Sequence, residues 1–133
     1  MKPVTHMHDS GKRQEFVTGA VRDTAEGKYR PELISPFMIK RLGQWLELGA
    51  RKYADRNWEK GISMDRTVAS LMRHTNEYRM GDRSEDHLAA IVCNAMFLIH
   101  YEEMISRGLL PKELDDVPRY TETKNAGNPP RPV

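Results

Sequence analysis

The side chains best suited to chemistry lie between Arg66 and Asn94. Ser70, His74 and Glu77 follow one another at i, i+4 and i+7. On a helix this spacing places all three on one face, where they form a polar stripe. An imidazole beside a carboxylate is suited to acid–base chemistry or to metal ligation.

A second group of polar residues follows at once. The turn Gly81–Ser84 leads to Glu85, Asp86 and His87, which open a helix whose surface is otherwise apolar apart from Asn94. If the two helices pack antiparallel, the polar stripe faces the acidic start of the second helix. Carboxylates that converge between helices are ligands for hard cations such as Mg²⁺. The candidate metal ligands are Glu77, Asp86, Asp82 and Glu85.

A structural explanation for the same residues stays open. Acidic residues are favoured in the first turn of a helix by its dipole, which accounts for Glu85 and Asp86 without a metal. Arg73 and Glu77 have the spacing of a surface ion pair, and His74 suits a hydrogen bond in the core. The spacing alone therefore leaves a metal site and a solvated helix edge as alternatives.

Three helices are expected to position these residues. Ser35–Pro36 is a helix start, with serine as the N-cap, and the apolar period extends to about Tyr53. A second helix runs from the N-cap Ser63 to about Met80, and a third from Ser84 to about Arg107. The third has a wide apolar stripe, which marks it as the central buried helix.

The segments outside these helices carry fewer signals. Residues 1–34 show no sustained period and are expected to form a loop-rich, mostly extended arm, with Arg22 and Lys28 as cations that suit a phosphate or simply solvent. Residues 35–117 form the expected helical domain. Residues 118–133 are expected to be a flexible tail.

The loop between the first two helices contains an unexpected aromatic residue. Trp58 lies in a polar segment, close after Lys52 and Asn57. It either packs under the loop as a small hydrophobic cluster or offers a stacking surface for a planar base, with Asn57 bonding to the edge of that base.

The composition indicates one globular domain. The chain has 133 residues, of which 38% are hydrophobic and 30% charged, and its net charge of +2 gives no overall reason for binding nucleic acid. Its single cysteine, Cys93, excludes an intrachain disulfide. The N-terminus lacks the apolar segment of a signal peptide, and the apolar run Leu88–Ile99 is too short to span a bilayer. We expect a cytoplasmic protein with no membrane partner.

The three helices are too short to cover their own apolar stripes. Self-association is a usual solution for so small a core. We therefore expect a homo-oligomer, a dimer or larger, that completes a helical bundle.

Three motifs in order resemble a known family. They are Thr18–Lys28, Gly49–Gly61 and the stretch Ser70–Asn94, the last with Arg73-His74, Gly81-Asp82 and Glu85-Asp86-His87-Leu88-Ala89-Ala90. Together they cover roughly residues 17 to 106 and resemble the N-terminal domain of the phage dATP/dGTP diphosphohydrolases, the MazZ-type enzymes. The arrangement also resembles the wider all-α, MazG-like nucleotide pyrophosphohydrolases.

The resemblance implies Mg²⁺-dependent hydrolysis of purine deoxynucleoside triphosphates to monophosphate and pyrophosphate, with Mn²⁺ as an alternative ion, by a small all-α bundle that assembles as a dimer or tetramer. It places the protein in phage nucleotide-pool remodelling, without a stable nucleic-acid partner. The chain departs from the MazG-like pattern, because it lacks the Glu-Glu-x-x-Glu motif and the Glu-x-x-Asp motif that follows it. In this chain the positions equivalent to those two motifs would be His74-x-x-Glu77 and the helix that carries Asp86 and Asn94.

The same resemblance implies roles for individual residues. The catalytic residues are His74, Glu77 and Asp86. The cations expected to bind the phosphates are Lys52, Arg73, Arg22 and Lys28. The residues expected to bind the base and sugar are Trp58, Tyr53 and Asn57. Asn94 is expected to position a metal-bound water or a ligating carboxylate. Two rival functions remain, a nucleotide- or nucleic-acid-binding module without catalysis and a helical interaction protein.

Overall fold

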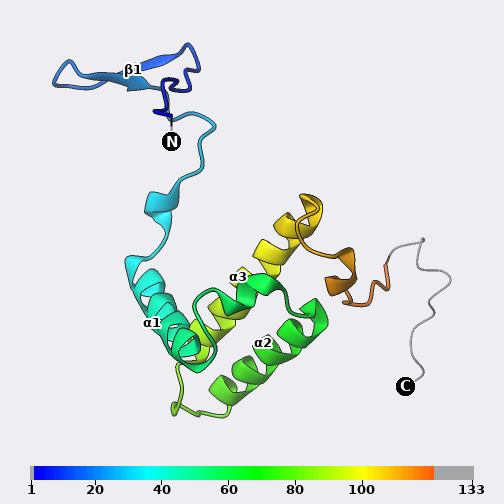
Figure 1. Ribbon diagram of the computed structural model, residues 1–133. Helices are drawn as coiled ribbons and strands as arrows, with labels where there is room; N and C mark the ends of the chain where they lie inside the picture. Colours follow the sequence, from blue (N-terminus) through cyan, green and yellow to red (C-terminus); the bar gives the residue numbers. More distant parts are fainter. Residues whose placement is uncertain (1, 122–133) are drawn as a thin grey trace. The chain divides into compact units, whose positions relative to one another are not determined.

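The computed structural model describes residues 2–121, and its longest elements are three α-helices (Figure 1). The expected all-α class is confirmed. The elements, in chain order, are β1 (Arg13–Glu15), β2 (Val21–Asp23), η1 (Pro31–Leu33), α1 (Pro36–Lys52), η2 (Asn57–Lys60), α2 (Met64–Arg79), α3 (His87–Ser106) and η3 (Lys112–Leu114). The chain divides into two compact units, Met1–Ile34 and Ser35–Val133, each described here by itself.

The N-terminal unit contains a hairpin that the sequence did not predict. β1 and β2 pair antiparallel, with Gln14 opposite Arg22. Gly19 closes the turn in a left-handed conformation (φ 86°) that favours glycine, and its N–H donates to the carbonyl oxygen of Phe16 at 2.8 Å. Each strand has only three residues and is almost wholly exposed, so the sequence has no alternating apolar pattern that would predict the hairpin.

The first two helices begin where their caps predict. The hydroxyl of Ser35 accepts from the N–H of Met38, and Pro36 takes the first helical position of α1. The hydroxyl of Ser63 accepts from the N–H of Arg66 at the start of α2. Asp116 reaches back to this second cap: it accepts from the Ser63 hydroxyl at 2.5 Å and from the Asp65 N–H at 2.8 Å. The segment after α3 is thus tied to the start of α2.

α3 is the central helix, as predicted, and packs against both α2 and α1. Its buried residues include Ala90, Cys93 and Tyr101, and burial raises the pKa of the Cys93 thiol to about 11. The Tyr101 hydroxyl donates to the carbonyl oxygen of Trp58 at 2.6 Å, which fixes the loop before α2 to α3. By length and composition alone α3 would also be able to cross a membrane, a test that the core helix of a soluble protein passes as well.

The start of α3 differs from the prediction. The helix begins at His87 and not at Ser84, because the side chain of Asp86 accepts from the N–H of Ala89 and is the N-cap. The hydroxyl of Ser84 donates to Asp82 instead. The other end agrees, since the helix closes at Ser106 and Gly108 follows with a φ of 72°. The predicted tail 118–133 lies mostly outside the described residues.

Candidate functional site

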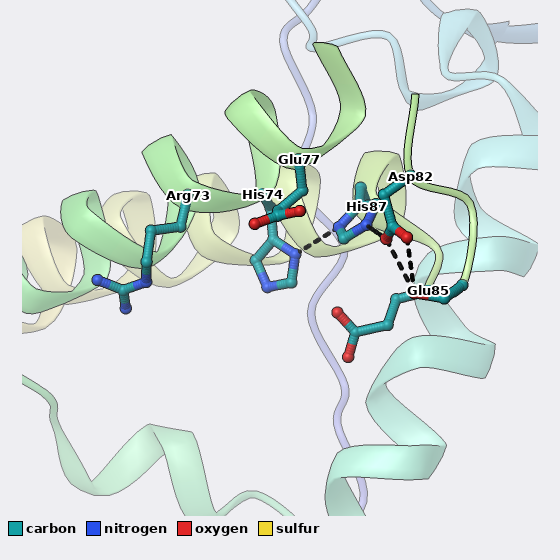
Figure 2. Close-up of a pocket in the computed structure, with 7 residues that line it drawn as sticks. Arg73, His74, Glu77, Asp82, Glu85 and His87 are labelled. Carbon is teal, nitrogen blue, oxygen red and sulfur yellow. Dashed lines mark hydrogen bonds and ion pairs between the residues drawn. The ribbon is translucent and has the colours of Figure 1, made fainter. Parts of the chain in front are cut away.

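An open pocket of about 370 Å³ lies between the second half of α2 and the loop that leads into α3 (Figure 2). The polar stripe and the acidic loop therefore meet, as the sequence predicted from antiparallel helices. The lining residues are Arg73, His74, Glu77, Asp82, Ser84, Glu85 and His87.

His87 and Asp82 form the buried side of the pocket. His87 is only 3% exposed, and its Nε2 lies 2.5 Å from Oδ2 of Asp82. This hydrogen bond, and then that from the Ser84 hydroxyl, hold the pKa of Asp82 below its ordinary value. Because an ionised carboxylate only accepts, Nε2 of His87 carries the proton and donates it. In the neutral imidazole, Nδ1 of His87 then has a lone pair.

His74 completes a chain of three side chains. Its Nδ1 lies 2.9 Å from Nδ1 of His87 (Figure 2). One of the two facing nitrogens must donate and the other accept, unless both share a cation. Trp45 on α1 packs edge-on against the His74 ring, with 5.8 Å between ring centroids. All three helices therefore contribute to the position of these imidazoles.

Two glutamates and one arginine complete the pocket wall. Glu77 and Glu85 are exposed, and within the described chain no hydrogen bond or ion pair engages either carboxylate. In Figure 2, Glu77 lies beside His74, while Glu85 reaches toward the rings from the loop before α3. Arg73 adds an exposed guanidinium. The pocket thus combines proton acceptors, possible metal ligands and one cation.

The structure gives Asp86 a role outside this pocket. Its carboxylate is paired with Arg41 of α1, at 2.9 Å from Nε and 2.5 Å from Nη2, while it also caps α3. Arg41, more than any other neighbour, holds the pKa of Asp86 below its ordinary value. Asp86 does not line the pocket. Its carboxylate, which the spacing predicted to be a metal ligand, is instead engaged by Arg41 and by the N-terminus of α3.

Asn94 also lies away from the pocket lining. It is buried between the helices, where its amide nitrogen donates to the carbonyl oxygen of Ala90 at 2.9 Å and to the hydroxyl of Ser70 at 3.4 Å. The contact with Ser70 joins α3 to α2, whereas the contact with Ala90 lies within α3. The polar stripe therefore has two halves, with Ser70 in a packing contact and His74 and Glu77 in the pocket.

The expected base-binding loop is not part of the same pocket. The Trp58 ring stacks on Phe97 of α3 at a centroid distance of 4.7 Å and meets His100 edge-on at 4.8 Å. From His87 to Phe97 is a distance of about 15 Å along the helix. This arrangement matches the alternative in which Trp58 packs under its loop.

The remaining predicted substrate residues are mostly exposed. Lys52 lies over the Tyr53 ring at 5.3 Å, and Asn57 begins the short helix η2. Lys28 pairs with Asp23 at 3.4 Å in the N-terminal unit, where Arg22 lies on β2. None of these five residues lines the pocket.

Arg41 and Trp45 are the site neighbours that sequence reasoning missed. Both lie on α1. Their i, i+4 spacing places them on one face, and this was the only available signal. It indicated a shared face but not the residues that the face would meet.

Comparison with known proteins supports one family. The family model described as dATP/dGTP diphosphohydrolase, N-terminal, matches residues 18–108, well over half of the chain and including every residue that lines the pocket. No curated protein and no solved structure matches the chain significantly.

Proposed function

The chain belongs to the dATP/dGTP diphosphohydrolase N-terminal domain family, and from this premise we propose that it hydrolyses dATP and dGTP to the monophosphate and pyrophosphate. The observation that carries the proposal is the pocket between α2 and the start of α3. Two imidazoles, three carboxylates and a guanidinium share this one open cavity.

Arg73 is the residue we assign to the triphosphate. A guanidinium presents a planar set of donors that matches phosphate oxygens, and within the described chain no ion pair or hydrogen bond occupies it. Its charge would offset the negative charge that develops during phosphoryl transfer. Lys52, Arg22 and Lys28 remain further cations proposed from the sequence and the family resemblance.

Glu77 is the residue we assign to the attacking water. Its unengaged carboxylate lies beside His74 at the pocket wall (Figure 2). As the water oxygen bonds to the α-phosphorus, the carboxylate takes one of its protons. The bond from the α-phosphorus to the α–β bridging oxygen breaks, and pyrophosphate carries away the electron pair of that bond. Both products are thereby accounted for.

The pocket fits the divalent cation that the family resemblance implies. Asp82 is engaged by His87 and Ser84, but within the described chain no hydrogen bond or ion pair engages the carboxylates of Glu77 and Glu85. The facing Nδ1 atoms of His74 and His87 could also bind an ion, in place of their contact with each other. A bound divalent cation would neutralise charge on the phosphates. We assign Glu85, which reaches toward the two rings from the loop before α3 (Figure 2), to the ion, and this leaves Glu77 for the proton.

The proposal is tested with all four deoxynucleoside triphosphates. The full chain is incubated with each in turn in the presence of a divalent cation, and nucleotide loss is measured by chromatography. We expect dATP and dGTP to be consumed faster than dCTP and dTTP. Equal consumption of all four would contradict the purine preference, and no consumption would contradict the activity.

We also propose that the chain self-associates as a dimer or tetramer. Large apolar side chains remain exposed on all three helices, among them Phe37 on α1 (78%), Met72 on α2 (64%) and Ile99 on α3 (69%). Burial of such surface against a second copy stabilises by roughly 25 cal/mol per Å² before association costs. Light scattering at micromolar concentration should show a mass above that of one chain, and a monomer would contradict this proposal.

A further inference from the structure

We propose that the pocket binds a first-row transition-metal ion through Nδ1 of His74, Nδ1 of His87 and the carboxylate of Glu85, with Asp82 as a positioning residue. The inference rests on the proposed function, because it names the ion of that same site. It differs from the ligand set expected from the spacing, in which the carboxylates of Glu77, Asp86, Asp82 and Glu85 are the candidates.

The spacing of the three donors carries the first step. One ligand atom from each of His74, Glu85 and His87 lies within 4.8 Å of the others. The two Nδ1 atoms are 2.9 Å apart. An ion about 2.1 Å from each nitrogen would hold them about 3.0 Å apart at a right angle and about 3.4 Å apart at a tetrahedral angle. The observed separation fits neighbouring positions of an octahedral ion.

Asp82 provides a second and independent observation. Histidines that ligate a metal usually donate their other ring N–H to a carboxylate, which fixes the tautomer and the ring orientation. His87 has this arrangement, since its Nε2 faces Asp82 at 2.5 Å and its side chain is buried. The lone pair of Nδ1 is thereby directed at the side of the ring where His74 lies (Figure 2).

The donor types decide which ions the site favours. Mg²⁺ prefers oxygen ligands and keeps much of its water, whereas imidazole suits first-row transition ions. Two histidines and one carboxylate recur in catalytic zinc sites and in non-haem iron sites, where open positions remain for water or substrate. In this chain Glu77 and Arg73 line the same pocket as the three donors. Substrate phosphate bound by Arg73 would therefore lie in the same pocket as the ion.

The test is metal binding without nucleotide. The full chain is stripped with a chelator and titrated with Mn²⁺ in a calorimeter, with and without equimolar Mg²⁺. We expect one tight Mn²⁺ site per chain that equimolar Mg²⁺ does not displace. Pulsed electron paramagnetic resonance of the bound Mn²⁺ should show coupling to imidazole ¹⁴N. Absence of that coupling, or equal competition by Mg²⁺, would overturn the proposal.

Variants assign the ligands. Glu85→Gln changes an exposed side chain, so it should leave the helical circular dichroism intact while it weakens Mn²⁺ binding about 100-fold. His74→Asn should weaken Mn²⁺ binding similarly and should also reduce the ¹⁴N signal. Asp82→Asn should weaken binding by about 10- to 100-fold with the ¹⁴N signal retained. Glu102→Gln and His8→Gln are matched controls outside the pocket. Wild-type affinity in folded Glu85→Gln and His74→Asn would overturn the ligand set.

The two proposals fail separately. A chain that binds Mn²⁺ through imidazole but leaves every deoxynucleoside triphosphate intact retains the metal site and loses the hydrolase function. A chain that hydrolyses dATP or dGTP with no ¹⁴N coupling at its ion retains the function and loses this ligand set.

Discussion

Nδ1 of His74 on α2 lies 2.9 Å from Nδ1 of His87 in the first turn of α3. This contact joins the two helices at the point where the loop between them supplies Asp82 and Glu85. Because His87 is buried and held by Asp82, the position of His74 is set by α3 as well as by its own helix. The chemistry of the pocket thus depends on how α2 and α3 pack.

Glu77→Gln should separate catalysis from folding. The carboxylate is exposed and within the described chain forms no side-chain hydrogen bond, so the substitution should leave the melting temperature unchanged. Loss of a proton acceptor typically costs 10²–10⁴-fold, and we expect kcat to fall by at least about 100-fold. Steady-state kinetics check this, with Glu102→Gln on α3 as the control. Near wild-type kcat in Glu77→Gln would remove this residue from the mechanism.

Asp86 should behave as a structural residue. Asp86→Asn keeps an N-cap side chain but loses the charge that pairs with Arg41, a half-exposed ion pair of small value. We expect nearly full activity and a slight loss of stability, whereas Asp86→Ala, which also loses the cap, should cost about 1 kcal/mol of unfolding free energy. Denaturant titration and kinetics measure both. Abolished turnover in a folded Asp86→Asn protein would restore Asp86 to the active site.

Variants of Trp58 should distinguish a packing role from a role in substrate binding. Trp58→Ala removes the ring that stacks on Phe97, and for a half-buried aromatic we expect a loss of about 2–3 kcal/mol. Trp58→Phe should recover most of that stability. If Trp58 also holds the base, the KM of Trp58→Phe rises while kcat stays the same. An unchanged KM would leave Trp58 with a packing role only.

Asp116 should make the fold sensitive to acid. Hydrogen bonds from the Ser63 hydroxyl, and then from the Asp65 N–H, lower the pKa of Asp116 below its ordinary value. A carboxyl whose pKa is lower in the folded state contributes stability above its unfolded pKa and loses it as the pH falls through the folded pKa. Asp116→Ala should therefore be less stable than wild type at pH 7, and the difference should narrow below about pH 4. A difference that is constant with pH would show that the carboxylate charge contributes nothing.

The helices and the location of the pocket could be predicted from the sequence, because both depend on local spacing. Ser35, Pro36 and Ser63 mark helix starts, and the i, i+3 spacing of His74 and Glu77 places them on one face. The pairings across elements could not be predicted. Nothing in the spacing of Asp86 shows that Arg41, on another helix, will engage its carboxylate. The same holds for Trp58. A tryptophan in a polar loop can stack on a substrate base or pack against the protein core, and only the position of Phe97 distinguishes these two roles.

The products formed from dGTP test the central claim most directly. The full chain is incubated with dGTP and a divalent cation, and the nucleotide and phosphate products are separated and identified. Hydrolysis at the α-phosphorus predicts dGMP and pyrophosphate in equal amounts, with both absent from the Glu77→Gln reaction. Formation of dGDP and inorganic phosphate, or unchanged dGTP, would contradict the account.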